Sequence, residues 1–315
     1  MNEVNGIKLI ATGHAAPARV VANDDLKQYV ETSDEWIARR TGIRERRFVG
    51  EGESVLSLSC AAARQALDRS GIDPRELACV LVATVSWEQA MPSMACMLHG
   101  ELGLPEDVPA ADVNAACAGF LYALELARGM MLANGKRYAL VVGGEAMSTL
   151  LNMGERETCV LFGDGAGAAV IELAADAPYA SVLGARASTV LTAWHADSAS
   201  PAIHMDGAAV YRFAVSTVPE VLTAMLQKAE LTLDDVDYVV CHQANERIID
   251  ACVRALRAPA EKFYKNVARW GNTCAASVPI ALDELMCSGK LAPGMRIACV
   301  GFGAGLSWAA ALLTV

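Results

Sequence analysis

Cys117 has the sequence context of a covalent nucleophile. It lies in the segment 114–120, Asn-Ala-Ala-Cys-Ala-Gly-Phe, directly before the amphipathic run 121–131, so we expect it at the N-terminus of a helix. Free N–H groups and aligned peptide dipoles at that end favour a thiolate over the ordinary thiol, whose pKa is about 8.5. A thiolate is a soft nucleophile that suits thioesters. The alternative is a small buried apolar side chain, which is our interpretation of most of the other cysteines.

Two further polar residues stand at the ends of expected elements. His242 follows the apolar strand 239–241, and a helix is expected to begin near Glu246. An imidazole at a strand end can point into a cleft, but it can equally be a hydrogen-bonded core histidine. Asn272, within Trp-Gly-Asn-Thr, could simply cap the helix that we expect over 275–285. The local pattern leaves both alternatives open.

An internal repeat helps to separate structural residues from chemical ones. Gly144 and Gly303 are 159 positions apart, and the same offset superimposes the helix and strand expected at 67–82 on those expected at 226–241. Structural residues should recur in both halves, whereas residues that do chemistry should differ. At this offset Cys117 aligns with Ala276, His242 with Ala83, and Asn272 with Val113. All three polar residues therefore break the repeat, at the strand ends where α/β folds place their sites.

Each half has the pattern of an α/β fold. Helices alternate with short, almost wholly apolar strands, such as 79–84 and 238–241, which belong in a sheet covered on both faces. Two duplicated halves that share the helices between their sheets would form five layers, αβαβα. We place the boundary between an N-terminal half, 1–173, and a C-terminal half, 174–315, where acidic residues and Pro178 interrupt the pattern.

Composition argues against several classes of protein. With 315 residues, 54% hydrophobic and 20% charged, the chain can bury a large core. Its net charge of −10 argues against nucleic acid as a partner, because phosphate binding needs a basic surface. The ten cysteines are scattered, with no C-x-x-C pair and no Cys/His cluster. We therefore expect no metal site and a reduced, cytoplasmic protein.

The sequence also argues against a membrane protein. Residues 1–4 include an acidic residue and lack the basic start and apolar stretch of a signal peptide. The uncharged segment 297–315 is nearly long enough to span a bilayer, but its three glycines at 301, 303 and 305 would break a helix. We expect a buried strand, a turn and a second strand there.

Two glycine-rich runs, 163–167 and 301–305, superficially resemble dinucleotide-binding fingerprints. The second leaves only ten residues after it, too few for a βαβ unit, and the first leads directly into the strand-like segment 168–171. Tight turns and close approach of the backbone explain both runs better.

Five motifs follow one another along the chain: TSDEW (32–36) with TGIRER (41–46), ACAGF (116–120), FGDGAGAA (162–169), HQAN (242–245), and GNT (271–273) running to Asp283 and Glu284. Together they resemble the motifs of β-ketoacyl-acyl-carrier-protein synthase III, the ketosynthase III of type II fatty-acid synthesis, which has a thiolase-like duplicated fold. The resemblance covers essentially the whole chain. It implies a homodimer that uses acyl-CoA as substrate and needs no cofactor.

The resemblance implies a reaction in two steps. Cys117 would take an acyl group from acyl-CoA, and the acyl-enzyme would then condense with malonyl-acyl carrier protein, releasing carbon dioxide. His242 and Asn272 would hold the malonyl thioester oxygen as it becomes an enolate. The N–H groups of Cys117 and Ala304 would form a second oxyanion hole, for the tetrahedral intermediate on the acylated cysteine.

Substrate-binding residues are implied in the same way. They are Trp36 and Arg156, stacked on the CoA adenine; Arg40 and Thr41, at its polar groups; Asn245, at the pantetheine arm; Thr32 and Gly207, elsewhere along CoA; Arg247 and Arg254, at the carrier protein; and Met91, at the primer pocket from across a two-fold dimer interface. An acidic enzyme needs such a local basic patch to attract acidic substrates. Each arginine could instead be a solvated surface charge.

The chain departs from the common pattern of the family at four places. The segment 184–203 is shorter than usual and lacks an Asp-Gly-Ser-like stretch. Ala208 stands where Asn is common near the pantetheine, Met91 where an aromatic residue is common, and Ala304 where Gly is frequent. Ala304 still offers its N–H, so we expect the chemistry to be retained. The departures leave open which acyl primer the enzyme uses.

Two other functions stay open at this point. A condensing enzyme of secondary metabolism, of polyketide or alkylquinolone type, would use similar residues on another acyl donor or acceptor. A non-catalytic acyl-CoA-binding protein would tolerate loss of the thiol, yet all three polar residues are present. A degradative thiolase is disfavoured, because it would need a second cysteine where this chain has Gly303-Ala304-Gly305.

Overall fold

The computed structural model describes residues 6–194 and 203–315. Its helices are α1 (Asp34–Thr41), α2 (Val55–Ser70), α3 (Met94–Leu102), α4 (Gly119–Asn134), α5 (Arg156–Cys159), α6 (Gly207–Lys228), α7 (Glu246–Leu256), α8 (Val267–Trp270) and α9 (Ser277–Cys287). Its strands are β1 (Gly6–Ala15), β2 (Arg19–Ala22), β3 (Glu45–Phe48), β4 (Leu77–Ala83), β5 (Ala110–Val113), β6 (Tyr138–Ala146), β7 (Asp164–Ala174), β8 (Ser181–Ala185), β9 (Leu191–Thr192), β10 (His204–Met205), β11 (Tyr238–Cys241), β12 (Arg296–Gly303) and β13 (Ser307–Thr314).

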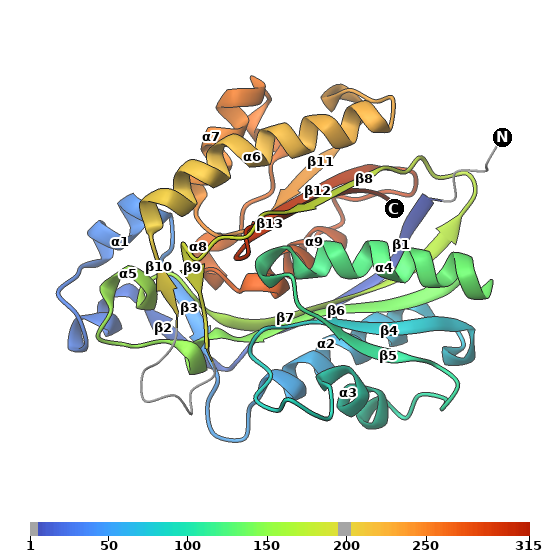
Figure 1. Cartoon of the computed structure of the whole chain (residues 1–315), viewed down its shortest axis with the longest axis horizontal. Helices are drawn as coiled ribbons and strands as arrows, with labels where there is room; N and C mark the ends of the chain where they lie inside the picture. The colour runs from blue at the N-terminus through green and yellow to red at the C-terminus, as the bar shows by residue number, and fades with distance from the viewer. Residues whose placement is uncertain (1–5, 195–202) are drawn as a thin grey trace.

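These elements are stacked in five layers. In Figure 1, α6 and α7 lie above the strands β11, β12, β13 and β8, and α2 and α3 lie below the strands β1, β7, β6, β4 and β5. The helices α4 and α9 lie between the two layers of strands. The five-layer α/β architecture expected from the sequence is confirmed.

The two halves pair their strands in the same order. β4, β6, β7 and β1 are successive neighbours, and so are β11, β12, β13 and β8. In both sets the first two strands are parallel and the later neighbours are antiparallel. β5 extends the first set, and the pair Lys8 and Thr314 joins β1 to β13. The repeat thus recurs in the sheet, while the division between residues 173 and 174 stays a prediction.

The middle layer contacts strands of both halves. α4 packs against β4 and β6 and also against β12 and β13, and α9 packs against β1, β7 and β11. Strands covered on both faces need no alternation of polar and apolar residues, and every residue of β4 is buried. By length and composition the span Ala116–Asn134 could cross a membrane, but here it forms a central helix of the fold. The uncharged C-terminal segment forms the antiparallel pair β12 and β13, as expected.

The glycine-rich runs allow backbones to approach closely. A Cβ atom on Gly167 of β7 would lie 2.6 Å from the backbone nitrogen of Ile280 in α9. One on Gly303, at the end of β12, would lie 2.7 Å from the backbone nitrogen of Cys117. Only glycine fits at such distances, so the structural interpretation of both runs is confirmed.

The structure shifts the alignment of the halves by one residue at the middle helices. α4 and α9 each follow a short 3-10 turn, whose first residue has a left-handed backbone: φ is 47° at Ala116 and 48° at Cys274. Cys117 therefore corresponds to Ala275, and the alignment with Ala276 is wrong. The residue still breaks the repeat, because its counterpart has no polar group.

Asn272 has no counterpart in the first half. β5 pairs with β4 through Ala110, and Phe263 pairs in the same way with β11. From Ala110 the chain reaches the left-handed residue in six positions (110 to 116), but from Phe263 it takes eleven (263 to 274), and this longer connection includes α8. The alignment of Asn272 with Val113 is therefore wrong, because a constant offset cannot represent connections of different length.

Candidate active site

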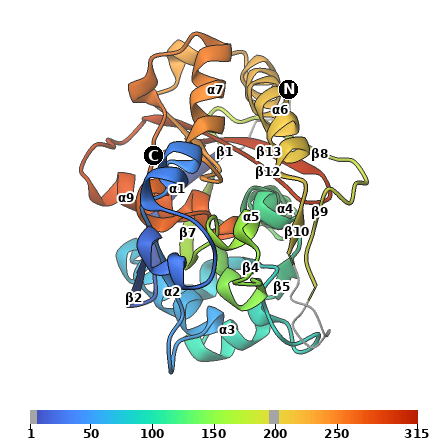
Figure 2. The same ribbon diagram turned by 90° about the vertical axis from the view of Figure 1, so that its left-hand side faces the viewer.

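Cys117 lies where two cavities meet. One has a volume of about 730 Å³ and runs from Trp36 and α7 to Cys117; we call it the α7 cavity. The other, about 740 Å³, runs from Cys117 to the residues after β8, including Trp194; we call it the β8 cavity. Residues that line both are Cys117, Phe162, Leu191 and Leu306. Figure 2 faces the end of the molecule that carries α1 and α5, two of the elements around the α7 cavity.

The electrostatic surroundings of Cys117 favour its thiolate. The thiol of Cys274, whose Sγ lies 3.3 Å from Cys117 Sγ, holds the pKa of Cys117 well below its ordinary value. Burial of Cys117 opposes this effect, while His242 adds to it. The sequence predicted a thiolate from the helix N-terminus, whereas the structure adds two side chains from the other half of the chain.

His242 is oriented by Ser277, the first residue of α9. Its Nδ1 lies 2.6 Å from Ser277 Oγ, which also accepts a hydrogen bond from Gln243 N at 3.3 Å. This contact engages Nδ1 and orients the ring, so Nε2 is the ring nitrogen left for other partners. Phe302 packs edge-on against the imidazole at 5.4 Å. His242 is buried and lines the α7 cavity.

Asn272 is held through both its backbone and its side chain. Its backbone N–H donates to Leu161 O at 2.8 Å and its carbonyl accepts from Gly163 N at 3.0 Å. Its Oδ1 accepts from Cys274 N at 2.9 Å, in the turn that precedes α9. The cap-like contact expected of Asn272 is therefore present, and the residue also lines the α7 cavity. Because Oδ1 is engaged, the amide NH₂ is the end left to donate.

The sequence analysis missed two residues of this site. It assigned no role to Cys274 or Ser277, yet these side chains contact Cys117 and His242. The repeat contained the signal for Cys274, since this residue occupies in the second half the position of Ala116, next to Cys117. That signal requires the corrected offset, which only the structure supplies.

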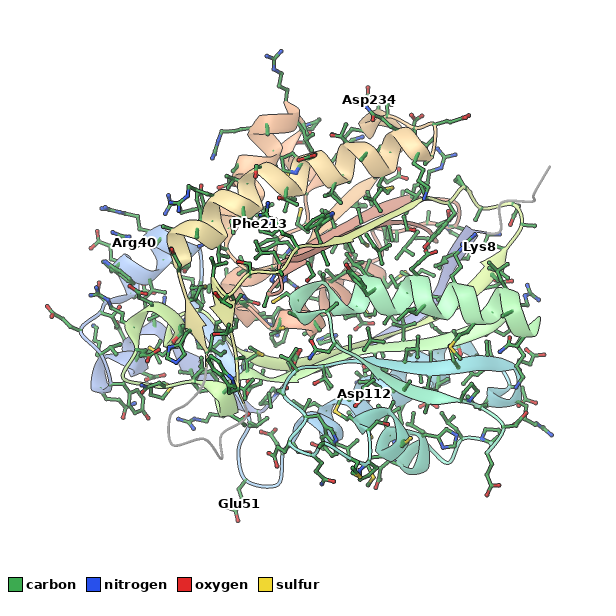
Figure 3. All side chains as sticks on the ribbon, viewed as in Figure 1. Lys8, Arg40, Glu51, Asp112, Phe213 and Asp234 are labelled. Carbon is green, nitrogen blue, oxygen red and sulfur yellow. The ribbon has the colours of Figure 1, made fainter. Side chains whose placement is uncertain are left out.

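Most of the predicted CoA residues lie together. Six of the predicted CoA residues line the α7 cavity: Trp36, Arg40, Thr41, Arg156, Gly207 and Asn245. Thr32 is not among them, and its Oγ1 is buried with no hydrogen-bond partner in the described part of the chain. The CoA role of Thr32 therefore has no cavity contact to support it. Arg40, on α1, marks the end of the molecule at which the predicted CoA residues gather, with Lys8 toward the other end (Figure 3).

Trp36 is flanked by two guanidinium groups. Arg156 lies 4.7 Å and Arg40 5.1 Å from the centre of the indole ring. Such cation–π contacts hold flat, charged groups at the mouth of the cavity, where a planar base and phosphates could bind.

Two of the predicted contacts have structural duties as well. Thr41 Oγ1 donates to Ile37 O at 2.7 Å and accepts from Ile43 N at 3.0 Å, which closes the end of α1. Asn245 caps α7 by accepting from Arg247 N at 2.9 Å, and its Nδ2 donates to Arg40 O at 3.2 Å. Asn245 thereby ties α1 to α7 across the cavity.

Arg247 and Arg254 lie two turns apart on α7, and both are exposed. Arg247 lines the α7 cavity, and its guanidinium lies 5.3 Å from the centre of the Tyr211 ring. The two residues form an exposed basic stripe that begins at the cavity mouth.

Ala304 and Met91 are placed differently. Ala304 lines the β8 cavity directly after β12, and its carbonyl accepts a hydrogen bond from Ser307 Oγ at 3.1 Å. Met91 is 81% exposed in the connection between β4 and α3 and lines neither cavity.

Of the shortened segment 184–203, residues 195–202 lie outside the described residues. Within residues 6–194 and 203–315, no group of three His, Cys, Asp or Glu side chains is placed to hold a metal ion.

Comparison with known proteins identifies close relatives. The family model described as 3-oxoacyl-[acyl-carrier-protein (ACP)] synthase III matches residues 111–193, and the model of its C-terminal part matches residues 226–315. A β-ketoacyl-[acyl-carrier-protein] synthase III of Clostridium beijerinckii is 41% identical over 98% of this chain and 99% of its own length.

Solved structures agree with these relatives. The 3-oxoacyl-[acyl-carrier-protein] synthase III of Aquifex aeolicus superimposes with a TM-score of 0.91 at 39% identity, covering 98% of this chain and 99% of that one. The priming β-ketosynthase of the R1128 polyketide biosynthetic pathway superimposes with a TM-score of 0.92 at 34% identity, covering 99% and 96%.

Proposed function

Because the chain belongs to the 3-oxoacyl-[acyl-carrier-protein] synthase III family and is a β-ketoacyl-acyl-carrier-protein synthase, we propose that its reaction proceeds through Cys117. The observation that carries the proposal is the convergence of the Cys117 sulfur, His242 and Asn272 on one cavity. One half of the duplicated fold supplies the nucleophile and the other supplies the two donors. The substrates proposed are acyl-CoA and malonyl-acyl carrier protein.

The first half-reaction loads the acyl group. The Cys117 thiolate attacks the thioester carbonyl of acyl-CoA, and collapse of the tetrahedral intermediate releases CoA as its thiolate. The N–H groups of Cys117 and Ala304 would stabilise the oxyanion. The close packing of Gly303 on the backbone of Cys117 supports this pairing, because it brings the end of β12 to the start of α4.

The second half-reaction forms the carbon–carbon bond. The malonyl thioester oxygen would accept hydrogen bonds from His242 Nε2 and the Asn272 amide, while loss of carbon dioxide places an electron pair on the α-carbon. That carbon attacks the acyl group on Cys117, and the cysteine leaves as a thiolate. The contact with Ser277 supports the role of His242, because donation to Nδ1 would leave the ring proton on Nε2, where a donor is needed as negative charge develops.

The α7 cavity would hold CoA and the carrier arm in turn. Trp36, Arg40 and Arg156 would meet the nucleotide end, with Thr41, Gly207 and Asn245 along the arm. On a chain of net charge −10, the exposed stripe of Arg247 and Arg254 supplies the local positive charge that an acidic carrier protein requires. The ten cysteines are free thiols, which supports a cytoplasmic location.

A homodimer would complete the primer pocket. β5 ends the sheet and exposes Ala111 and Asp112, so a second copy could extend it. Met91 would then reach the partner's β8 cavity. Methionine can move aside for longer acyl chains, so Met91→Phe should narrow primer use toward acetyl-CoA and Met91→Ala should broaden it. Unchanged primer preference in both variants would assign primer choice to the segment 184–203 or another part of the pocket.

The match to a polyketide priming ketosynthase supports a second candidate, a condensing enzyme of secondary metabolism. A panel of acyl-CoA primers, assayed with malonyl-acyl carrier protein, separates the candidates. Efficient use of short primers with the carrier protein of fatty-acid synthesis supports the first function. Failure on that carrier, with turnover on another acceptor, would favour the second.

A further inference from the structure

We propose that Cys274 is a positioning residue for the Cys117 sulfur, to which it donates its thiol proton and which it couples to the buried carboxyl of Glu145. The inference rests on the proposed function, in which Cys117 is the nucleophile. Its starting point is a contact between side chains 157 positions apart in the chain.

The two sulfurs are in hydrogen-bond contact, and Cys274 is firmly held. Cys274 is 2% exposed, its backbone N–H donates to Asn272 Oδ1, and its left-handed backbone fixes the start of the turn before α9. Contact with Cys117 and burial raise the pKa of Cys274 well above its ordinary value, as does the charge of Glu145. When this pair of thiols is ionised it holds a single proton, and because the proposed reaction needs Cys117 as the thiolate, that proton is on Cys274, which makes Cys274 the donor.

Glu145, on β6, interacts with the same thiol. Its carboxyl is fully buried and accepts hydrogen bonds from Ser86 Oγ at 2.6 Å and from Val85 N at 3.1 Å. Burial raises the pKa of Glu145 to about 7, against the lowering effect of the hydrogen bonds from Ser86, Val85 and Cys274. A buried carboxyl group thus interacts with the thiol of Cys274, which in turn contacts the Cys117 sulfur, and the proposed reaction does not use it.

One thiol proton therefore has two acceptors. When Glu145 is protonated, the Cys274 S–H is free to donate to the Cys117 thiolate. When Glu145 ionises, its carboxylate competes for that proton and adds a second negative charge, which destabilises the thiolate. His242 faces the same sulfur from the end of β11 and stabilises the thiolate in both states. Ionisation of Cys117 should therefore occur in two coupled steps.

Alkylation of Cys117 measures this coupling without any acyl substrate. The rate constant for iodoacetamide at Cys117 would be followed by peptide mass spectrometry across pH, for the full-length wild type, Cys274→Ala, Cys274→Ser and Glu145→Gln. Cys274→Ala should move the thiolate midpoint upward by about one pH unit, roughly a tenfold loss of thiolate fraction below the midpoint. Cys274→Ser keeps a donor and should restore part of the shift. Glu145→Gln should remove the inflection near pH 7 and leave a single step.

The matched control is Cys252→Ala, which removes a buried thiol that interacts with Cys241 and lies outside this site. Its profile should coincide with that of the wild type. Coincident profiles for wild type and Cys274→Ala, or an unchanged inflection in Glu145→Gln, would overturn the inference. If Cys274→Ala does not fold, Cys274→Ser and Glu145→Gln decide the matter. Acyl loading from acyl-CoA, measured in parallel, tests the proposed function separately, because its failure would leave the alkylation profiles interpretable.

Discussion

The helices α4 and α9 begin with nearly the same backbone conformation, but the side chains at their starts have different roles. Each follows a left-handed residue, Ala116 or Cys274, and a 3-10 turn, and each helix lies in the middle layer. The 3-10 turn before α4 presents the thiol of Cys117, whereas the matching turn before α9 presents the thiol of Cys274, and Ser277, the first residue of α9, contacts His242. The duplicated scaffold thus brings the matching turns of both halves to one site, and in the proposed reaction one turn supplies the nucleophile while the other supports it.

The largest effect should come from removing the chemistry of the α4 turn. Cys117→Ser replaces a thiolate with a hydroxyl that stays protonated, so overall turnover should fall by at least about 10³-fold. Intact-mass measurement after incubation with acyl-CoA should show one acyl group per chain in the wild type and none in the variant. Cys96→Ser, which changes an exposed cysteine of α3, is the control and should load normally. Equal acyl loading of Cys117→Ser would remove Cys117 from the mechanism.

The next effect concerns the connection that only the second half possesses. Asn272→Ala should slow condensation by about 10²- to 10³-fold, because an oxyanion donor is lost, with a smaller effect on acyl loading. Asn272→Asp keeps the oxygen that accepts from Cys274 N and removes the donor, so single-turnover kinetics should show a similar loss. If only the alanine variant is impaired, Asn272 acts by holding the turn and not as a donor.

A smaller effect should follow from removing the support in the α9 turn. Ser277→Ala takes away the hydroxyl that contacts Nδ1 of His242 and orients the ring, and condensation should slow by about tenfold. Ser277→Thr retains a hydroxyl and serves as the matched variant. Rapid-quench separation of the two half-reactions would show whether the defect is confined to condensation, and a loss confined to acyl loading would contradict the assignment of His242.

The outer helices extend the comparison to the surface. α7 exposes Arg247 and Arg254, whereas its counterpart α3 exposes Met97. Arg247→Glu should raise the KM for malonyl-acyl carrier protein several-fold, and added salt should raise the KM of the wild type, because both weaken charge attraction. Met97→Glu on α3 is the control. If neither Arg247→Glu nor added salt changes the KM for malonyl-acyl carrier protein, the carrier protein docks on another surface.

The smallest effect should be on stability, at the shared left-handed position. Ala116→Gly relieves a backbone conformation that is unfavourable for alanine, but it also raises the conformational entropy of the unfolded chain. The free energy of unfolding should therefore rise by only roughly 0.5 kcal/mol. Urea unfolding monitored by circular dichroism would measure it. A clear loss of stability would mean that the Ala116 methyl group contributes more packing than the strain costs.

Much of the architecture was predictable because its signals are local. Apolar strands such as 79–84 and the periodic helices between them fix the class of fold, since a strand without polar alternation must be covered on both faces. The placement of Cys117 at a helix N-terminus was predictable for the same reason, from a short apolar helix that begins just after it. The alignment of the halves failed only where their connections differ in length, as at Asn272.

The sequence by itself determined the layered fold, and it pointed to Cys117 and to several residues that line its cavity, because motifs and periodicity are properties of neighbouring residues. The tertiary structure alone decided that Cys274 touches Cys117 and that Ser277 orients His242. It also left Thr32 and Met91 outside the cavities of this chain. A pKa or a tautomer depends on atoms within a few ångströms, and those atoms belong to residues that the chain brings together only when both halves share their middle layer.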